Sequence, residues 1–140
     1  MLSLSKGFPL VLSRICITTQ GGHHMAIRET IHGNAAVLKV SGKLMGGKET
    51  KEITEKVRSL LSDDIKNIII DLGKVNWMNS TGLGTLIESR RLITEKDGVL
   101  KLSAVTEKIK SLLMITQIMY LFETYETADR AIASFHQSLK

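Results

Sequence analysis

Cysteine, proline and aromatic residues are scarce in this 140-residue chain, which has one cysteine, one proline and 4% aromatic residues. The lone Cys16 cannot form an internal disulfide, and it offers too few thiolates for a cysteine–histidine zinc site. It fits a reducing compartment, so we expect the protein in the cytoplasm. The few aromatic residues disfavour an aromatic-rich β-sandwich. No apolar run approaches the roughly 20 residues of a membrane-spanning helix, so we expect no direct insertion into a membrane.

Charge of neither sign dominates. The chain has 19 basic and 14 acidic residues, a net charge of +5 at pH 7. The two signs interleave, as in residues 48–52 (KETKE), which is typical of solvated helix faces. No basic run alternates with aromatic residues, so nothing in the sequence supports nucleic-acid binding. The length corresponds to a single ordinary domain.

Residues 1–24 differ in composition from the rest of the chain. They contain two basic residues, Lys6 and Arg14, and no acidic one. Their apolar patch is short and is interrupted by Pro9, unlike the longer apolar centre of a signal peptide. We therefore expect residues 1–24 to be a flexible N-terminal extension or a leader, with a targeting segment as the alternative. The folded domain is expected at residues 25–140.

After residue 25 the apolar pattern alternates between strands and helices. The turn signal Gly33-Asn34 separates two expected strands, so these form a hairpin. The remaining pattern predicts further strands and amphipathic helices, with glycine-rich loops between some of them. The strands are expected at 26–32, 35–40, 65–72 and 99–102, the helices at 48–62, 80–96, 106–116 and 126–139, and the loops at 41–47 and 73–79. Residues 118–122 could be strand or helix. Alternating strands and helices imply crossover connections and a mostly parallel sheet, hence an α/β fold.

A first candidate site lies at residues 42–48 (GKLMGGK), which match the G-x-x-x-x-G-K pattern of a phosphate-binding loop. The next residue is Glu49, where Ser or Thr would bind Mg²⁺, and its carboxylate would repel phosphates. Asp71 is the only contender for a second metal-binding acid. A flexible turn before a helix explains the segment better, and a nucleotide-binding or hydrolytic enzyme remains the alternative.

A second candidate site lies at the start of the helix expected at 80–96. Asn79 and Ser80 are both good N-cap residues, so helix capping alone could explain them. A helix N-terminus also tolerates a phosphate, and phosphorylation of Ser80 would add about −1.5 to −2 charge there. A catalytic serine is disfavoured because the segment is not a G-x-S-x-G elbow and His32 and His136 are the only histidines after residue 24. We expect no catalytic residue, no metal and no cofactor.

Residues 78–84 (MNSTGLG) resemble the M-D-S-[ST]-G-L-G signature of anti-sigma factor antagonists, the bacterial single-domain STAS proteins. Other segments resemble further parts of the family pattern in the same order; these are residues 40–44 (VSGKL), 65–77, 98–102 (GVLKL) and 108–116 (KIKSLLMIT). The resemblance covers about residues 25–140. It implies a STAS-type fold, with a mixed, mostly parallel sheet of four to five strands, an opening hairpin and helices packed mainly on one face.

The resemblance also implies a partner switch that regulates transcription. In this family the unmodified antagonist binds an anti-sigma factor that is also a serine kinase, and so releases a sigma factor. The kinase phosphorylates the antagonist, the complex dissociates, and a PP2C-type phosphatase restores it. On this chain the acceptor would be Ser80, with Thr81 beside it as a second hydroxyl. The implied partner-binding surface comprises Gly42, Lys43, Met45, Asn79, Thr81, Gly82 and Leu83, on a chain that is monomeric when free.

Three positions depart from the family pattern. Asn79 stands where the family usually has Asp, Met45 lies where another Asp is usual, and Lys43 replaces a Glu. Contacts that depend on those negative charges would be lost or rewired. The departures favour an alternative, in which the chain is an unphosphorylated STAS scaffold or a subunit of another assembly, for example a membrane transporter.

Overall fold

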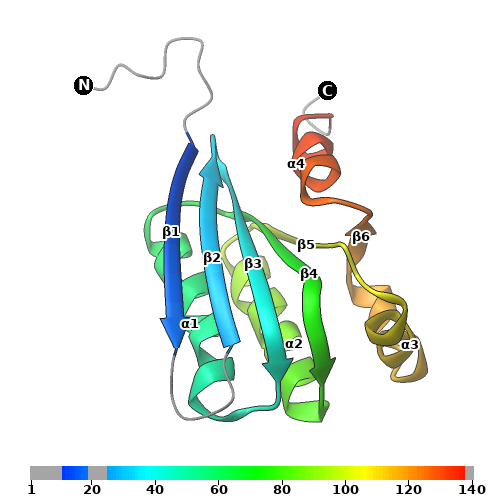
Figure 1. Ribbon diagram of the computed structural model, residues 1–140. Helices are drawn as coiled ribbons and strands as arrows, with labels where there is room; N and C mark the ends of the chain where they lie inside the picture. Colours follow the sequence, from blue (N-terminus) through cyan, green and yellow to red (C-terminus); the bar gives the residue numbers. More distant parts are fainter. Residues whose placement is uncertain (1–10, 19–24, 138–140) are drawn as a thin grey trace.

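The computed structural model of the chain describes residues 11–18 and 25–137, which form a sheet flanked by helices (Figure 1). The strands are β1 (Val11–Thr18), β2 (Met25–His32), β3 (Ala35–Leu44), β4 (Asn67–Met78), β5 (Val99–Ser103) and β6 (Glu123–Tyr125). The helices are α1 (Gly47–Ser62), α2 (Ser80–Glu95), α3 (Glu107–Ile115), α4 (Ala128–Gln137) and the short 3-10 helix Ile118–Leu121. The strands lie in chain order, antiparallel from β1 to β3 and parallel from β3 to β6.

The mixed, mostly parallel sheet confirms the expected α/β fold and its opening hairpin, although the sheet has six strands rather than four to five. One additional strand is β1, which pairs with β2 along its whole length. Part of the expected flexible extension is therefore a strand, in a segment rich in β-branched residues (VLSRICIT). The rest of residues 1–24 lies outside the described residues.

Strands β3 and β4 are longer than the sequence pattern indicates. The segments 41–47 and 73–79 were expected to be loops, but most of their residues continue the strands and pair from Ser41↔Lys74 to Leu44↔Met78. Two irregularities in the register absorb the extra residues, as β-bulges do, and Gly42 accommodates a φ of +102°. Only two residues connect β3 to α1. This short connection corrects the phosphate-loop alternative, because no glycine-rich loop is left to surround a phosphate.

The predicted helices are present, with ends that shift by up to two residues at the boundaries the structure describes. The ambiguous residues 118–122 form mainly the 3-10 helix, and β6 follows. The final helix was expected at 126–139 and is α4, although residues 138–140 lie outside the described part of the chain. Within the described residues, no helix is both long and apolar enough to cross a membrane.

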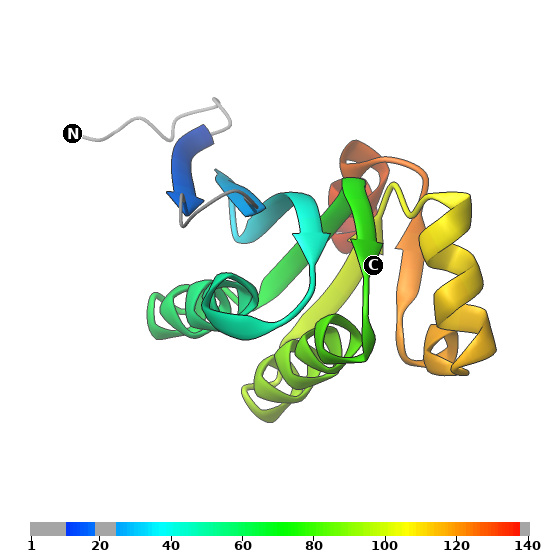
Figure 2. The same cartoon turned by 60° about the horizontal axis from the view of Figure 1, so that its bottom comes forward.

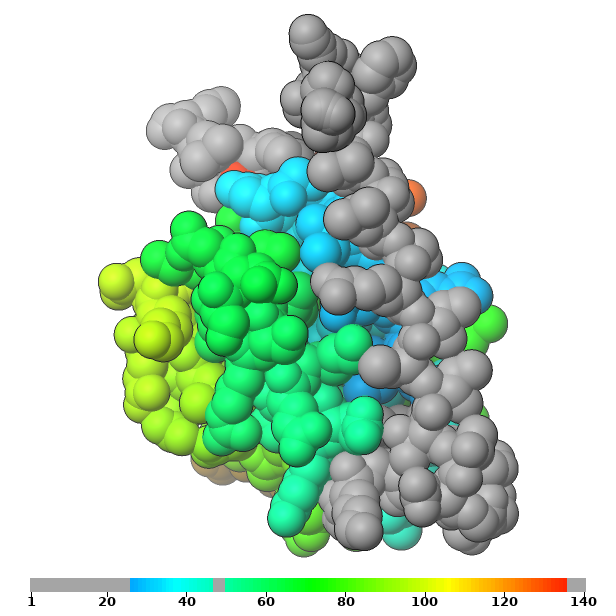
Figure 3. All heavy atoms as spheres, turned by 90° about the vertical axis from the view of Figure 1, so that its left-hand side faces the viewer, coloured from blue at the N-terminus to red at the C-terminus, as the bar shows by residue number. Residues whose placement is uncertain are grey.

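Helices α1, α2 and α3 pack on one face of the sheet, which confirms the prediction that helices lie mainly on one side (Figure 2). Alternate strand residues, such as Ile68 and Ile70 of β4, point into this layer and meet apolar residues of the three helices. Figure 3 views this layer from the β1 side, where α1 (blue-green) and the loop after it (green) form the surface beside the end of α2 (yellow-green).

Helix α4 packs on the opposite face, over β3, β4 and β5. A small second core joins Phe135 and Ala131 of α4 to strand residues that include Val37 and Ile69. Lys101 of β5 is buried beneath α4, where its Nζ donates a hydrogen bond to Ser134 Oγ at 2.6 Å. This hydrogen bond joins α4 to β5 of the sheet.

Candidate functional site

The candidate site forms where β3 and β4 end side by side. Leu44 and Met78 are the last residues of the two strands and lie opposite each other in the parallel register. The backbone N–H of Asn79 then donates to the carbonyl oxygen of Leu44 at 3.1 Å. Because the carboxyl ends of parallel strands meet at one edge, the β3–α1 connection and the start of α2 lie together. In the sequence, Met45 of the connection and Asn79 before α2 are 34 residues apart.

Asn79 is the N-cap of α2, and its side chain joins this helix to the β3–α1 connection. Its Oδ1 accepts a hydrogen bond from the Gly82 N–H at 3.0 Å, and its Nδ2 donates to the Met45 carbonyl oxygen at 3.0 Å. One side chain thus caps the helix and binds the β3–α1 connection. An aspartate could make the first bond but has no donor for the second. The departure from the family's usual Asp therefore has a structural role in this chain.

We expect Asn79→Ala to lower the free energy of unfolding by about 2 kcal/mol, combining a lost N-cap of about 1 kcal/mol with a lost hydrogen bond of about 1 kcal/mol. Asn79→Asp should lower it by about 1 kcal/mol or less, because the cap is kept and a negative charge is favourable at a helix N-terminus. Urea denaturation of the three proteins measures both values. An Asp variant as unstable as the Ala variant would show that the side-chain cap contributes nothing.

Ser80 is the first residue of α2 and is exposed to solvent. Among the described residues its hydroxyl has no hydrogen-bond partner, and the first turn of α2 contains no acidic residue. The helix N-terminus offers unpaired N–H groups and the positive end of the helix dipole. A phosphate on Ser80 would therefore meet a favourable local field and would disturb no existing hydrogen bond.

Thr81 lies beside Ser80 and contacts the β3–α1 connection. A Cβ added to Gly46 would lie 2.9 Å from Thr81 Cγ2, and Gly46 also has a φ of +97°, so this position favours glycine. Thr50 of α1 fixes the same connection, because its Oγ1 accepts from the Gly46 N–H at 2.8 Å and donates to the Gly46 oxygen at 3.1 Å. Thr50 was not identified in the sequence, where only its place in the first turn of a helix could have suggested it.

Two residues expected on the partner-binding surface face the interior instead. Leu83 is 6% exposed and belongs to the main core, and Gly82 is buried against Leu44. Both residues pack α2 on the sheet, and neither exposes a side chain that a partner could contact. This corrects the expectation for both positions.

The other expected residues are surface residues, but they divide between two places. Met45, with 49% of its surface exposed, lies with Asn79, Ser80 and Thr81 at the start of α2. Gly42 and Lys43 belong to β3 itself. Lys43 is exposed and lies opposite Trp77 of β4.

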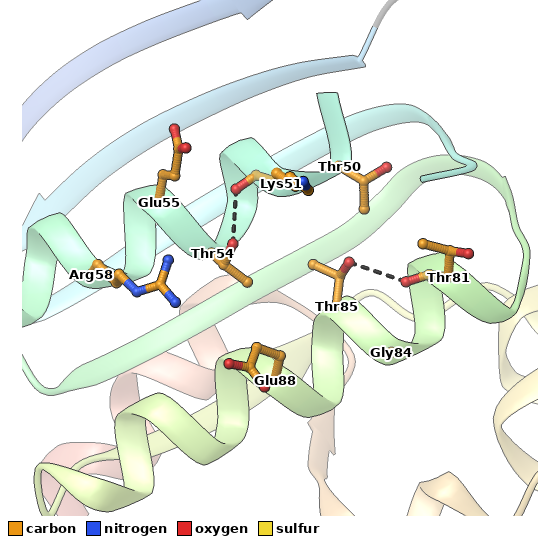
Figure 4. A pocket seen from close by; sticks show the side chains of 9 residues that line it. All are labelled: Thr50, Lys51, Thr54, Glu55, Arg58, Thr81, Gly84, Thr85 and Glu88. Atoms are coloured by element: carbon orange, nitrogen blue, oxygen red, sulfur yellow. Dashed lines mark hydrogen bonds between the residues drawn. The ribbon is translucent and has the colours of Figure 1, made fainter. Parts of the chain in front are cut away.

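A groove of about 560 Å³ runs between α1 and α2 and includes Thr81 (Figure 4). It is lined by Thr50, Lys51, Thr54, Glu55 and Arg58 of α1 and by Thr81, Gly84, Thr85 and Glu88 of α2. Two of its hydroxyls donate to their own helix, from Thr54 to the Lys51 oxygen at 2.8 Å and from Thr85 to the Thr81 oxygen at 3.1 Å. The groove was not predicted from the sequence. Threonines four residues apart in both helices, at 50 and 54 and at 81 and 85, place hydroxyls on one face of each helix and could have indicated it.

The charges of the groove are mixed. Hydrogen bonds from Arg91 lower the pKa of Glu88 most, and the positive charges of Arg91 and Arg58 lower it further. Glu88 is thus ionised at neutral pH and balances basic neighbours. A lining of hydroxyls and opposite charges suits a polar protein segment better than an apolar small molecule.

The site has no arrangement for nucleophilic catalysis among the described residues. His32, the one histidine whose side chain the structure describes, contacts Thr30 in β2 and lines a different hollow beneath α4. Ser80 therefore has no described histidine to activate it as a nucleophile. The arrangement offers an accessible hydroxyl at the start of a helix.

Comparison with known proteins gives a consistent result. Residues 26–131 match the family model of the STAS domain. The anti-sigma-B factor antagonist of Staphylococcus aureus is 26% identical over 106 residues, which cover 76% of this chain and 97% of the relative. A putative anti-sigma factor antagonist from Thermotoga maritima has a similar structure, with a TM-score of 0.68, 20% identity and coverage of 76% of this chain and 91% of that one. The Bacillus cell fate determinant SpoIIAA in its phosphorylated form has a TM-score of 0.59 at 16% identity, with coverage of 73% and 91%.

Proposed function

Because this chain belongs to the STAS domain family, we propose that it is an anti-sigma factor antagonist, a regulatory binding protein whose partner is an anti-sigma factor. In its unphosphorylated form it binds an anti-sigma factor that is also a serine kinase, and a sigma factor is released. Phosphorylation at Ser80 ends the complex, and a PP2C-type phosphatase regenerates the binding form. The protein acts in the cytoplasm as a monomer when free.

The observation that carries this proposal is the position of Ser80. Its exposed hydroxyl lies at the N-terminus of α2, next to Met45 and Thr81. A partner that covers this edge must cover the hydroxyl. The name of the S. aureus relative supports the proposed function, and the phosphorylated form of SpoIIAA supports phosphorylation as its control.

A phosphate would change this surface strongly and the fold weakly. It would add about −1.5 to −2 charge to a helix start that has no acidic residue in its first turn. The helix dipole favours that charge within the protein. An acidic or tightly packed partner surface would be repelled, and charges of the same sign held together in an interface cost several kcal/mol.

The test combines phosphosite mapping with partner affinity. We expect protein isolated from its own cells to carry one phosphoryl group on Ser80, in a fraction that differs between growth and stress. With the serine kinase/anti-sigma factor of the same organism, Ser80→Asp should raise Kd at least tenfold, about 1.4 kcal/mol. Ser80→Ala should bind like the unmodified protein, because the hydroxyl makes no described hydrogen bond.

Ser111→Asp is the matched control, because Ser111 is an exposed serine on α3. It should leave Kd unchanged. A chain that carries no phosphate on Ser80 or Thr81 under either condition, together with wild-type affinity in Ser80→Asp, would contradict the switch. Those results would favour the constitutive scaffold or transporter subunit.

A further inference from the structure

Four basic side chains gather on the sheet face that faces away from α1 and α2. They come from three neighbouring strands and are called here the basic strip: Arg28 of β2, Lys39 and Lys43 of β3, and Lys74 of β4. All four are exposed. The three strands come from separate segments of the sequence, and the sheet register makes their basic residues neighbours.

The strand register fixes the direction of these side chains. Arg28 and Lys39 lie opposite each other, and the adjacent pair Ile27 and Val40 belongs to the core under α1 and α2. Since successive side chains of a strand alternate between faces, Arg28 and Lys39 point to the other side. They also line a hollow with residues of α4, which lies on that side.

At the carboxyl end of the strip, Lys43 and Lys74 also point away from the helical layer. Lys43 precedes the core residue Leu44, and Lys74 precedes the core residue Val75. Helix α4 covers only the beginning of β3, where Val37 contacts it. Among the described residues, no helix covers the second half of β3 on this face, and Figure 1 shows this part of the sheet open.

The strip forms no ion pair with the acidic residues of the described strands. None of its four cations forms an ion pair with a described residue. The acidic residues of β2, β3 and β4 are Glu29 and Asp71. Glu29 pairs with Lys56 on the helical side. Asp71 lies opposite Lys39 in the register, but it is buried and accepts hydrogen bonds from Ser103 and the Gly73 N–H.

Helix α4 contributes one acid near the strip. Asp129 lines the same hollow as Arg28 and Lys39, but it forms no ion pair with either. Two like charges directly opposite each other in an antiparallel pair destabilise a sheet. The pair Arg28↔Lys39 therefore costs folding free energy, and neither residue has a described ion pair that would offset this cost. An external anion would offset it.

We infer that the basic strip is a docking surface for an extended, acidic segment of a protein partner. The strip extends to the end of β3, next to the start of α2. Lys43 directly precedes Leu44, whose carbonyl oxygen accepts a hydrogen bond from the Asn79 N–H. A partner seated at Ser80 can thus continue onto it. The inference rests on the proposed function only in assigning the acidic segment to the same partner; the surface and its ligand chemistry do not depend on phosphorylation.

The geometry favours a peptide over a lipid surface or a nucleic acid. Lys39 and Lys43 are four residues apart, about 13 Å along a strand, and Arg28 and Lys74 flank them at strand spacings of about 4.8 Å. Carboxylates on alternate residues of an extended segment repeat every ~6.7 Å and can reach these cations. The one aromatic residue of β2, β3 and β4 is Trp77, which lies opposite Lys43, and Lys108 lies over its ring at 5.8 Å. Side chains for insertion into lipid or for base stacking are therefore few.

The test uses a labelled ten-residue peptide of alternating Glu and Ala, with Gln–Ala and Lys–Ala peptides for comparison. We expect the unphosphorylated protein to bind only the acidic peptide, with an affinity that falls at least tenfold between 20 and 300 mM salt, about the response expected for screened ion pairs. Amide shifts in NMR spectra should concentrate on β2, β3 and the end of β4. Lys39→Glu/Lys43→Glu should weaken binding at least tenfold.

Lys96→Glu/Lys110→Glu is the matched control, because it makes the same charge change at exposed lysines of other elements. It should alter peptide affinity less than twofold. An equal loss in both double variants would overturn the inference, since net charge alone would then explain binding. Binding to phosphatidylserine vesicles in place of the peptide, or to neither, would also overturn it. Ser80→Asp should still bind the peptide, so failure of the switch and failure of the strip are distinguishable.

Discussion

Gly82→Ala is expected to lower the free energy of unfolding by about 2–3 kcal/mol, a typical cost of overpacking in a core. A Cβ at this position would lie 2.4 Å from the Leu44 carbonyl oxygen and 2.9 Å from Leu44 Cβ. The closest atom belongs to the backbone of β3 and cannot rotate away. Helix α2 would have to move from the sheet, and with it Asn79 and Ser80. The midpoint of urea denaturation measures the loss.

Gly84→Ala is the matched control for this substitution. Gly84 lies two residues further along the same helix and is exposed, and no described atom lies within 4 Å of the Cβ it would gain. Because glycine is a poor helix former, the alanine should stabilise the protein by about 0.5–1 kcal/mol. Equal stability changes for the two variants would contradict the close approach of α2 to β3.

Lys101→Ala is expected to lower the free energy of unfolding by about 3 kcal/mol. The Lys101 ammonium donates to Ser134, lies 3.4 Å from the Glu123 carboxylate and lies 4.2 Å from the centre of the Phe135 ring. The hydrogen bond of the charged group, about 1.5–3 kcal/mol, and the cation–π contact, about 2 kcal/mol, largely offset the desolvation of the buried ammonium. Most of the expected loss therefore comes from the packing of the side chain, whose truncation in a core costs about 2–5 kcal/mol. Lys101 is 5% exposed, so its replacement by alanine leaves a gap beneath α4. Urea denaturation gives the size of the loss, and hydrogen exchange should show faster opening of α4.

Lys101→Met separates the charge from the packing. It keeps a flexible apolar stem, and replacing a buried charge by an apolar side chain is often close to neutral. We expect a loss of about 1 kcal/mol or less, since Glu123 is 64% exposed and stays hydrated without its partner. A Met variant as unstable as the Ala variant would assign most of the stabilisation to the ammonium group.

The stability that the contacts around Lys101 contribute should depend on pH through Glu123. The hydrogen bond from the Tyr125 hydroxyl lowers the pKa of Glu123 most, and the charge of Lys101 lowers it further, from an ordinary value of 4.5. A carboxyl group with a lowered pKa in the folded state stabilises the protein above its unfolded pKa. That contribution is lost as the pH falls below about 4.5. Glu123→Gln should therefore lose less stability than the unmodified protein between pH 5 and pH 3.

The sequence predicted the order of helices and strands from β2 to α3, and the final helix, because these elements repeat their apolar residues with their own periods. It did not predict β1 or β6. The sequence also indicated the N-cap at Asn79 and the phosphate-tolerant position of Ser80, since both depend only on the start of α2. The family resemblance in residues 78–84 predicted the fold, which the structure confirms, and it is the basis for proposing Ser80 as the acceptor. These features are local, so a short window of residues contains the information for them.

The tertiary structure decided what depends on contacts between distant residues. Glycine-rich segments looked like loops, but the pairing of β3 with β4 makes most of them strands. Gly82 and Gly84 have the same side chain, and only the position of β3 makes one a close contact and leaves the other in open space. Strand register, likewise, brings Arg28, Lys39 and Lys74 together from three separate segments. Pairing and register result from the free energy of the whole sheet, and a local pattern of residues does not contain them.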